Sequence, residues 1–277
     1  MRLWISSIKS FMNTSADLPR IVVITGASHG IGAACAEQFL ANGDIVYGLC
    51  RSTPSDDRIR HIPTDLKNDS SVKNAIDQIS REFGRIDVLL LNAGIGISGA
   101  VEFTDLKDAQ HQFDVCYFGS LRVLVPALSL LRESKGMVLF TSSVASVTPI
   151  PFQAHYSACK AAINALVSAL RNELHPHQVR VAAILPGDVK TDFTGSRKKD
   201  ERGSEIYPAL INSVAKMEHD EQHGMDPSRI ARKFLQVSRK RNPKPYYSVG
   251  FAYQAICVLV KVLPSRLAAW IIRLLYA

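Results

Sequence analysis

Residues 21–32 read IVVITGASHGIG and decide the fold of this chain. The aliphatic run Ile21–Ile24 leads directly into a glycine-rich turn, which is typical of a buried parallel strand that ends at a tight turn. Gly26, Gly30 and Gly32 let the backbone pack closely and leave amide N–H groups at the start of a helix, where they can bind a phosphate. The spacing therefore predicts a dinucleotide-binding turn, and a purely structural strand-to-helix turn is the alternative.

Strands and helices alternate beyond this turn. Apolar runs predict strands at 21–24, 45–49, 58–62, 88–91, 137–141 and 179–185, and helical spacing predicts helices at 33–41, 71–83, 106–131 and 156–174. Strands joined through helices form right-handed βαβ units, which build a parallel sheet with helices on both faces. The sequence therefore predicts a single-domain, doubly wound α/β fold over residues 20–250. A polar insertion at about 188–226 is expected to form a substrate lid, and a basic helix is expected at 227–238.

Composition and cysteine usage exclude several classes of protein. The 277 residues are 47% hydrophobic and 21% charged, which excludes a disordered chain, a collagen-like chain and a disulfide-stapled miniprotein. The five cysteines are odd in number and include no C-x-x-C pair, so neither a disulfide framework nor a zinc site is predicted. His219 and His223 have a spacing that can hold a metal ion, but their acidic neighbours and the lack of a third ligand favour a solvated helix. We therefore expect no metal site.

Positive charge is concentrated toward the C-terminus. The formal net charge is +8, and residues 197–277 hold fifteen Lys or Arg against seven Asp or Glu. No recognition motif accompanies this charge, so we expect no nucleic-acid partner and favour solubility or an anionic lipid surface. Residues 251–277 form an apolar, basic tail, whose longest apolar stretch is shorter than the ~20 residues of a membrane-spanning helix.

Residues 1–19 form a leader, which is either a short amphipathic helix or a disordered segment. This leader does not fit a signal peptide.

Four further motifs follow the glycine turn. They are Asn92-Ala93-Gly94, Ser143, Tyr156-Ser-Ala-Cys-Lys160 and Pro186-Gly187-Asp188-Val189-Lys190-Thr191. In this order and spacing, with thirteen residues from Ser143 to Tyr156, the set resembles the classical short-chain dehydrogenase/reductase family over about residues 20–250. The end of the chain more weakly resembles the steroid- and retinol-dehydrogenase-like branch. The resemblance implies a Rossmann fold, a nicotinamide dinucleotide cofactor and a homodimer or homotetramer.

Tyr156 and Lys160 are the candidate catalytic pair. Four residues apart on a predicted helix, they project from one face and can reach the same ligand, whereas an isolated pair of this kind would be a surface Tyr and Lys. Tyrosine has an ordinary pKa near ~10, and a neighbouring ammonium favours the phenolate. The resemblance implies that Tyr156 exchanges a proton with the substrate oxygen, that Ser143 hydrogen-bonds this oxygen, and that Lys160 also holds the nicotinamide ribose.

Cys116 departs from the family pattern. The chain reads Asp114-Val115-Cys116-Tyr117-Phe118-Gly119 where the family carries Asn in an Asn-x-x-Gly context. In the family that asparagine helps to hold a water in a proton relay to the lysine, and a thiol is a weaker hydrogen-bonding group. We expect slowed or rerouted proton exchange with the chemistry retained. Cys116 itself is either a buried, inert thiol or a redox-sensing one.

The end of the second strand favours NADP(H) over NAD(H). An acidic residue here would bind the ribose hydroxyls, but Cys50 holds that position and Arg51 can pair with a 2′-phosphate. His29 stands where NADP-preferring relatives often carry a cation, and Asp65 resembles the adenine-contacting aspartate of the family. The candidate cofactor-binding residues are Gly26, Ser28, His29, Gly30, Ile31, Gly32, Arg51, Asp65, Leu66, Asn92, Ala93, Gly94, Tyr156, Lys160, Pro186, Gly187, Val189 and Thr191.

Apolar residues beside the motifs predict the substrate side. The candidate pocket residues are Ile95, Ile97, Ala145, Phe152 and Phe193, with Val144, Pro149, Ile150 and Pro151 nearby. Apolar walls favour a lipophilic carbonyl or alcohol of steroid, retinoid or long-chain type. We therefore expect a cytoplasmic, NADP(H)-dependent oxidoreductase that interconverts an alcohol and a ketone or aldehyde. The tail can contact a membrane, border the pocket or pack against another subunit.

Two alternatives belong to other functional classes. A dinucleotide-binding sensor or scaffold with little turnover is suggested by Cys116, and a membrane-peripheral interaction protein is suggested by the basic, apolar tail. The presence of Ser143, Tyr156 and Lys160 argues against the first alternative.

Overall fold

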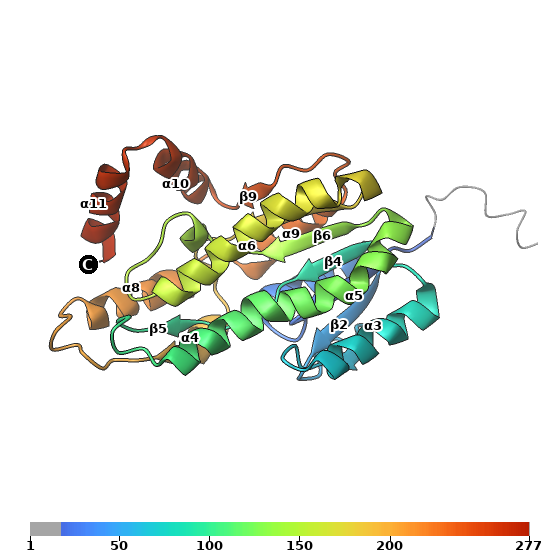
Figure 1. Ribbon diagram of the computed structural model, residues 1–277, viewed down its shortest axis with the longest axis horizontal. Coiled ribbons are helices and arrows are strands. Elements are labelled where there is room, and N and C mark those ends of the chain that lie inside the picture. Colours follow the sequence, from blue (N-terminus) through green and yellow to red (C-terminus); the bar gives the residue numbers. More distant parts are fainter. Residues whose placement is uncertain (1–17, 277) are drawn as a thin grey trace, which may run out of the picture.

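A seven-stranded parallel sheet forms the centre of the molecule (Figure 1). The computed structural model describes residues 18–276, so most of the predicted leader lies outside the described residues. In sheet order the strands are β3 (Arg60–Pro63), β2 (Ile45–Cys50), β1 (Ile21–Thr25), β4 (Val88–Leu91), β6 (Met137–Thr141), β7 (Arg180–Leu185) and β9 (Tyr246–Ser248). The order reverses between β1 and β4, which is the switch point of a doubly wound sheet.

Helices cover both faces of the sheet. On one face lie α3 (Asp69–Phe83), α5 (Gly119–Ser134) and α6 (Ala154–Glu173), and on the other lie α2 (Gly30–Ala41) and α9 (Pro227–Ser238). The hydrophobic core on the first face includes Val123 and Val167, and the core on the second face includes Phe39 and Phe234. Because both faces are covered, the central strands are continuous apolar runs rather than alternating ones. The predicted single-domain α/β fold is confirmed.

The glycine turn connects β1 to α2 by a very close backbone approach. Gly26 and Gly30 have φ angles of +68° and +54°, which side chains rarely adopt. A Cβ atom at Gly32 would lie 2.0 Å from the carbonyl oxygen of Gly26. Glycine is therefore required at Gly32 for packing, whatever ligand the turn holds.

Three differences from the predicted elements concern the main sheet and its covering helices. The helix expected at 106–131 is α4 (Leu106–Phe113), a π-helical turn (Asp114–Phe118) and then α5. The apolar spacing continues through the turn, so it hides the break in hydrogen bonding. β9 was not predicted, because three residues between a proline-rich loop and a glycine give no clear period. α2 begins at Gly30, before the expected start, because its first turn holds two glycines, which are weak helix formers.

The continuous helical stretch 106–134 has the length and apolar composition of a membrane-spanning helix. Its apolar window is 44% buried inside the protein, and Val123, Leu124 and Leu131 pack in the core. We interpret it as a core helix.

Smaller elements lie at the carboxyl edge of the sheet. The insertion contains α7 (Phe193–Ser196), β8 (Lys198–Lys199) and α8 (Leu210–Gln222), and the tail contains α10 (Phe251–Val262) and α11 (Ser265–Tyr276). β8 pairs with β5 (Ile97–Ser98), which ties the insertion to the loop after β4. The insertion and the tail therefore surround the side chains that follow β1, β4 and β6.

The approach at Gly32 gives a stability prediction. We expect Gly32→Ala to lower the free energy of unfolding by roughly 1–3 kcal/mol, because the new methyl group forces the turn apart. Urea denaturation followed by circular dichroism measures this change. Gly195→Ala is the matched control, since nothing lies within 4 Å of a Cβ there, and it should change stability by less than about 0.5 kcal/mol. Equal effects of the two substitutions would contradict the packing role.

Candidate active site

A cavity of about 800 Å³ runs along the carboxyl edge of the sheet. It begins at the glycine turn, passes the ends of β4 and β6, and reaches the insertion and the tail. Every predicted cofactor-binding residue lines it except Gly32, which packs against Gly26 instead. Distant parts of the sequence are therefore gathered around one space, at the switch point of the sheet.

The glycine-turn end of the cavity fits a phosphate-bearing dinucleotide. The N-cap residue of α2, His29, makes no side-chain cap, and the first turn of the helix holds no acidic residue. Amide N–H groups at this helix start are thus left to face an anion, which the helix dipole also favours. Arg51 lies exposed on the rim of the same cavity, and Asp65 and Leu66 border it.

Asn92 connects the glycine turn to the end of β6. Its backbone N–H donates to Thr25 Oγ1 at 2.9 Å, and its side-chain amide donates to the carbonyl oxygens of Thr25 and Gly26 at 3.2 and 3.4 Å. Its side-chain oxygen accepts from Thr141 Oγ1 at 3.0 Å. The ends of β1, β4 and β6 are therefore joined by one side chain.

Ser143, Tyr156 and Lys160 meet at the middle of the cavity. The Tyr156 hydroxyl is hydrogen-bonded to Ser143, and Lys160 Nζ lies 5.6 Å from the centre of the Tyr156 ring. Lys160 Nζ also donates to the carbonyl oxygen of Thr141 at 2.8 Å, which fixes its position. Ser142 points away, with Oγ donating to the backbone of α6 at 3.4 Å, so Ser143 is the serine beside Tyr156.

Burial sets the protonation state of this cluster. It raises the pKa of Tyr156 above its ordinary value, and the Lys160 ammonium and the Ser143 hydrogen bond only partly oppose the rise. The expected tuning by Lys160 is present, but desolvation outweighs it in the protein alone. Burial disfavours the charge on Lys160, yet the facing Tyr156 and Cys116 raise its pKa. The resting site therefore holds a protonated phenol beside an ammonium.

Cys116 is buried in the π-helical turn, and its Sγ and Lys160 Nζ both lie within 4 Å of a Cβ placed on Gly94. Its Sγ accepts hydrogen bonds from the N–H of Ile95 at 3.4 Å and from Gln112 Nε2 at 3.2 Å. Sγ also lies 3.7 Å from the carbonyl oxygen of Ile95, to which the thiol can donate. The neighbouring Cys159 and the charge of Lys160 lower the pKa of the Cys116 thiol against the effect of burial. The inert and the redox-sensing thiol both stay predictions.

The predicted substrate residues divide into two groups. Ile95, Ala145 and Phe193 line the cavity, and the Phe193 ring lies 5.9 Å from the ring of Tyr156. Ile97 and Phe152 do not border the cavity. Ile97 is buried in β5, and Phe152 packs against the apolar side of α8. Their contact with substrate stays a prediction.

Several lining residues were missed because the tail and insertion fold back on the site. Gln153, Glu221 and side chains from α10 and α11 border the cavity. The Tyr253 hydroxyl of α10 donates to Asp188 at 2.6 Å, and a Cβ at Gly187 would lie 2.3 Å from the Tyr253 ring. Only the tail's apolar spacing pointed toward this arrangement, and it did not distinguish pocket from surface.

The described residues contain no group of three or more His, Cys, Asp or Glu side chains that could hold a metal ion. His219 and His223 stack with ring centres 4.2 Å apart, and both lie on the exposed side of α8.

Comparison with known proteins points to one family. The family described as short chain dehydrogenase matches residues 20–202. A 3-ketodihydrosphingosine reductase of Bacteroides thetaiotaomicron is 33% identical, with 94% of this chain and 98% of that protein covered. An NADPH-dependent 3-dehydrocapnine reductase of Ornithobacterium rhinotracheale is 29% identical, with 90% and 94% covered. A short-chain dehydrogenase structure from Streptomyces avermitilis superposes with a TM-score of 0.82 at 25% identity, covering 92% of this chain and 97% of that one.

The surroundings of Cys116 predict a thiol that ionises at a lower pH than an ordinary cysteine. A thiolate absorbance step at 240 nm should therefore appear below the ordinary cysteine pKa of 9.0, and Cys116→Ser should remove this step. Cys35→Ser is the control and should keep the step, because burial raises the pKa of Cys35. Because the folded pKa of Cys116 is lowered, its thiolate contributes stability that is present above pH 9.0 and is lost as the pH falls through the folded pKa. A wild-type step at or above the ordinary value, or the absence of a step, would contradict this prediction.

Proposed function

The chain belongs to the short chain dehydrogenase family and is an oxidoreductase, and from that premise we propose that it is an NADPH-dependent reductase of a lipophilic ketone or aldehyde. The observation that carries the proposal is the meeting of Ser143, Tyr156 and Lys160 beside an uncapped helix start in one cavity. A dinucleotide extended from the α2 turn toward Tyr156 would be held by the glycine turn, Asn92–Gly94 and Lys160. When bound, the reduced nicotinamide supplies the hydride for the substrate carbon.

The chain's own residues supply the proton and the orientation. Ser143 donates a hydrogen bond to the substrate carbonyl oxygen and holds it beside the Tyr156 hydroxyl. Tyr156 then gives its proton to that oxygen as negative charge develops on it. Lys160 stabilises the phenolate that remains, because its ammonium is fixed close to the ring by Thr141. Burial keeps Tyr156 protonated, which is the form that reduction needs, and the weaker acid that results depends on Lys160 to release its proton.

We propose a long-chain ketone as the substrate class. The far part of the cavity is lined by apolar side chains of Ile95, Phe193 and the tail helices. Two relatives that span nearly the whole chain are named for 3-ketodihydrosphingosine and 3-dehydrocapnine, which supports a lipid ketone over a steroid or retinoid. A substrate of this type partitions into membranes, so we expect a cytoplasmic protein that works close to a membrane.

A homodimer or homotetramer remains our expectation for the assembly. Phe118 and Val125 are exposed on the helical stretch that contains α5, and a second copy would remove this apolar surface from water. The alternative of a dinucleotide-binding sensor with little turnover rests on Cys116. The hydrogen bonds of this thiol with Ile95 and Gln112 leave the bond between Tyr156 and Ser143 intact. No observation therefore favours a sensor over an oxidoreductase.

Tyr156→Phe tests the catalytic role. We expect NADPH oxidation with 3-ketodihydrosphingosine to fall by about a hundredfold or more, because the proton donor is lost, while NADPH binding changes little. Absorbance at 340 nm measures the rate, and nicotinamide fluorescence measures the binding. Tyr207→Phe is the control, since it removes only a surface hydrogen bond to Glu102, and its rate should be unchanged. Comparable turnover in Tyr156→Phe, or no oxidation by the wild type with any carbonyl tried, would refute the proposal.

Arg51→Glu tests the cofactor preference. Arg51 borders the adenosine end of the cavity, so its loss should weaken NADPH binding by about ten- to a hundredfold and leave NADH binding nearly unchanged. Arg58→Glu is the matched control on the same loop, because Arg58 pairs with Asp56 outside the cavity. Fluorescence titration with both nucleotides gives the two dissociation constants. Equal wild-type affinities for NADPH and NADH would contradict the proposed preference for NADPH.

A further inference from the structure

The tail helices stand outside the body formed by the sheet and its covering helices (Figure 1). α10 contains no buried residue, and the tail contributes little to the protein core. The inner side chains of the two helices nevertheless line the active-site cavity. They include Ile256, Val260, Leu263, Ile271 and Ile272. The tail is therefore a wall of the cavity whose other side faces away from the protein.

The outer side of this wall is strongly apolar. Phe251 is 86% exposed, Val262 72% and Leu274 64%. Val258, Leu267 and Trp270 are also exposed on the same two helices. Scattered apolar residues are normal on a surface, but a group on one short helical pair indicates a binding surface.

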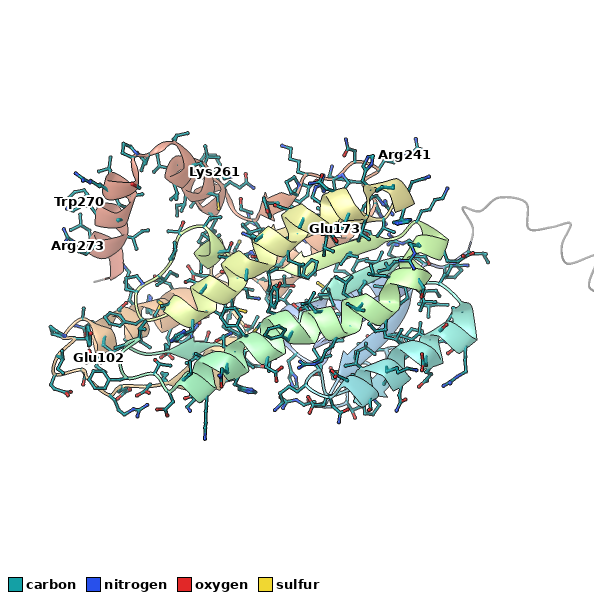
Figure 2. The ribbon with its side chains drawn as sticks, in the orientation of Figure 1. Glu102, Glu173, Arg241, Lys261, Trp270 and Arg273 are labelled. Atoms are coloured by element: carbon teal, nitrogen blue, oxygen red, sulfur yellow. The ribbon has the colours of Figure 1, made fainter. Side chains whose placement is uncertain are left out.

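The charges on the tail have one sign. Lys261, Arg266 and Arg273 are exposed, and residues 251–277 contain no Asp or Glu. Figure 2 shows Lys261, Trp270 and Arg273 on these helices, outside the sheet and its covering helices. A partner must therefore offer negative charge together with an apolar interior.

An anionic bilayer meets both requirements better than a second copy of this chain. A symmetric contact between two tails would bring like charges together, at a cost in free energy. Lipid headgroups instead pair with Lys and Arg, tryptophan is favoured at the boundary between headgroups and acyl chains, and the apolar side chains enter the acyl region. The cavity on the inner side of the tail is where a lipid-derived molecule would arrive.

We propose that the outer surface of α10 and α11 docks on an anionic lipid bilayer, and that long-chain substrate reaches the cavity between these helices. The docking stands on the tail itself, and the substrate path rests on the proposed function. The tail thus acts as both membrane contact and cavity wall.

Co-sedimentation of the full chain with vesicles tests the docking. The wild type should bind phosphatidylglycerol-containing vesicles, and bind phosphatidylcholine vesicles more weakly. Lys261→Glu with Arg273→Glu should weaken binding by about tenfold or more, because each cation near a charged surface contributes to the attraction. Phe251→Ser with Trp270→Ser should weaken binding to both kinds of vesicle.

Two matched controls come from outside the tail. Lys240→Glu with Arg241→Glu makes the same charge change at two exposed sites, and Val101→Ser with Leu106→Ser removes two exposed apolar side chains. Both should bind vesicles like the wild type. Absence of vesicle binding, or equal loss in the control and tail variants, would overturn the proposal. A dimer that dissociates in the tail variants, without vesicle binding, would assign the surface to a second copy instead.

Activity separates this proposal from the proposed function. If the chain reduces ketones, the charge-reversed variant should keep its rate on a short, water-soluble ketone and lose rate on a long-chain ketone delivered in vesicles. Equal rates of that variant and the wild type on the vesicle-borne ketone would overturn the substrate path. A chain that reduces nothing defeats the proposed function, and vesicle binding then still decides whether the tail docks.

Discussion

The side-chain amide of Asn92 holds the carboxyl edge of the sheet together, and the site depends on it. It donates to the backbone of the glycine turn and accepts from Thr141, whose carbonyl oxygen in turn receives Lys160 Nζ. One chain of hydrogen bonds thus runs from the glycine turn to Lys160. Because these groups are partly or wholly buried, leaving any one unpaired would cost about 1–3 kcal/mol, so the network keeps the turn and the lysine in a fixed relation.

The same network places Lys160 close enough to Tyr156 for each to offset part of the cost of burying the other. A tyrosine deep in a cavity holds its proton more firmly than in water, and a lysine there would lose its own proton without partners. Lys160 limits the rise in the pKa of Tyr156, and negative charge on Tyr156 or Cys116 would in turn favour the ammonium of Lys160. The carbonyl oxygen of Thr141 also accepts a hydrogen bond from that ammonium. Each group therefore offsets part of the desolvation of another when it ionises.

Local patterns were sufficient for six of the seven strands of the sheet and for the glycine turn, and the family resemblance supplied Ser143 beside Tyr156 and Lys160. Aliphatic runs and a four-residue spacing on one helix depend only on neighbours in sequence, which is why they could be interpreted without a structure. Strands β8 and β9 form by pairing with distant segments, and the π-helical turn around Cys116 lies inside an apolar spacing that continues through it. No periodicity marks those pairings, since β8 and β9 hold only two and three residues.

The tail shows how weak attachment and substrate access are related. Its firmest described link to the body is at Tyr253, which bonds Asp188 and packs on Gly187, in the loop that follows β7. Elements with few buried contacts open at lower free-energy cost than the core, and α10 buries none of its residues. Under the proposed docking, a bilayer that covers the apolar outer side of the tail would hold the two helices in place. The position of the tail would then limit the length of molecule that fits between these helices and Tyr156.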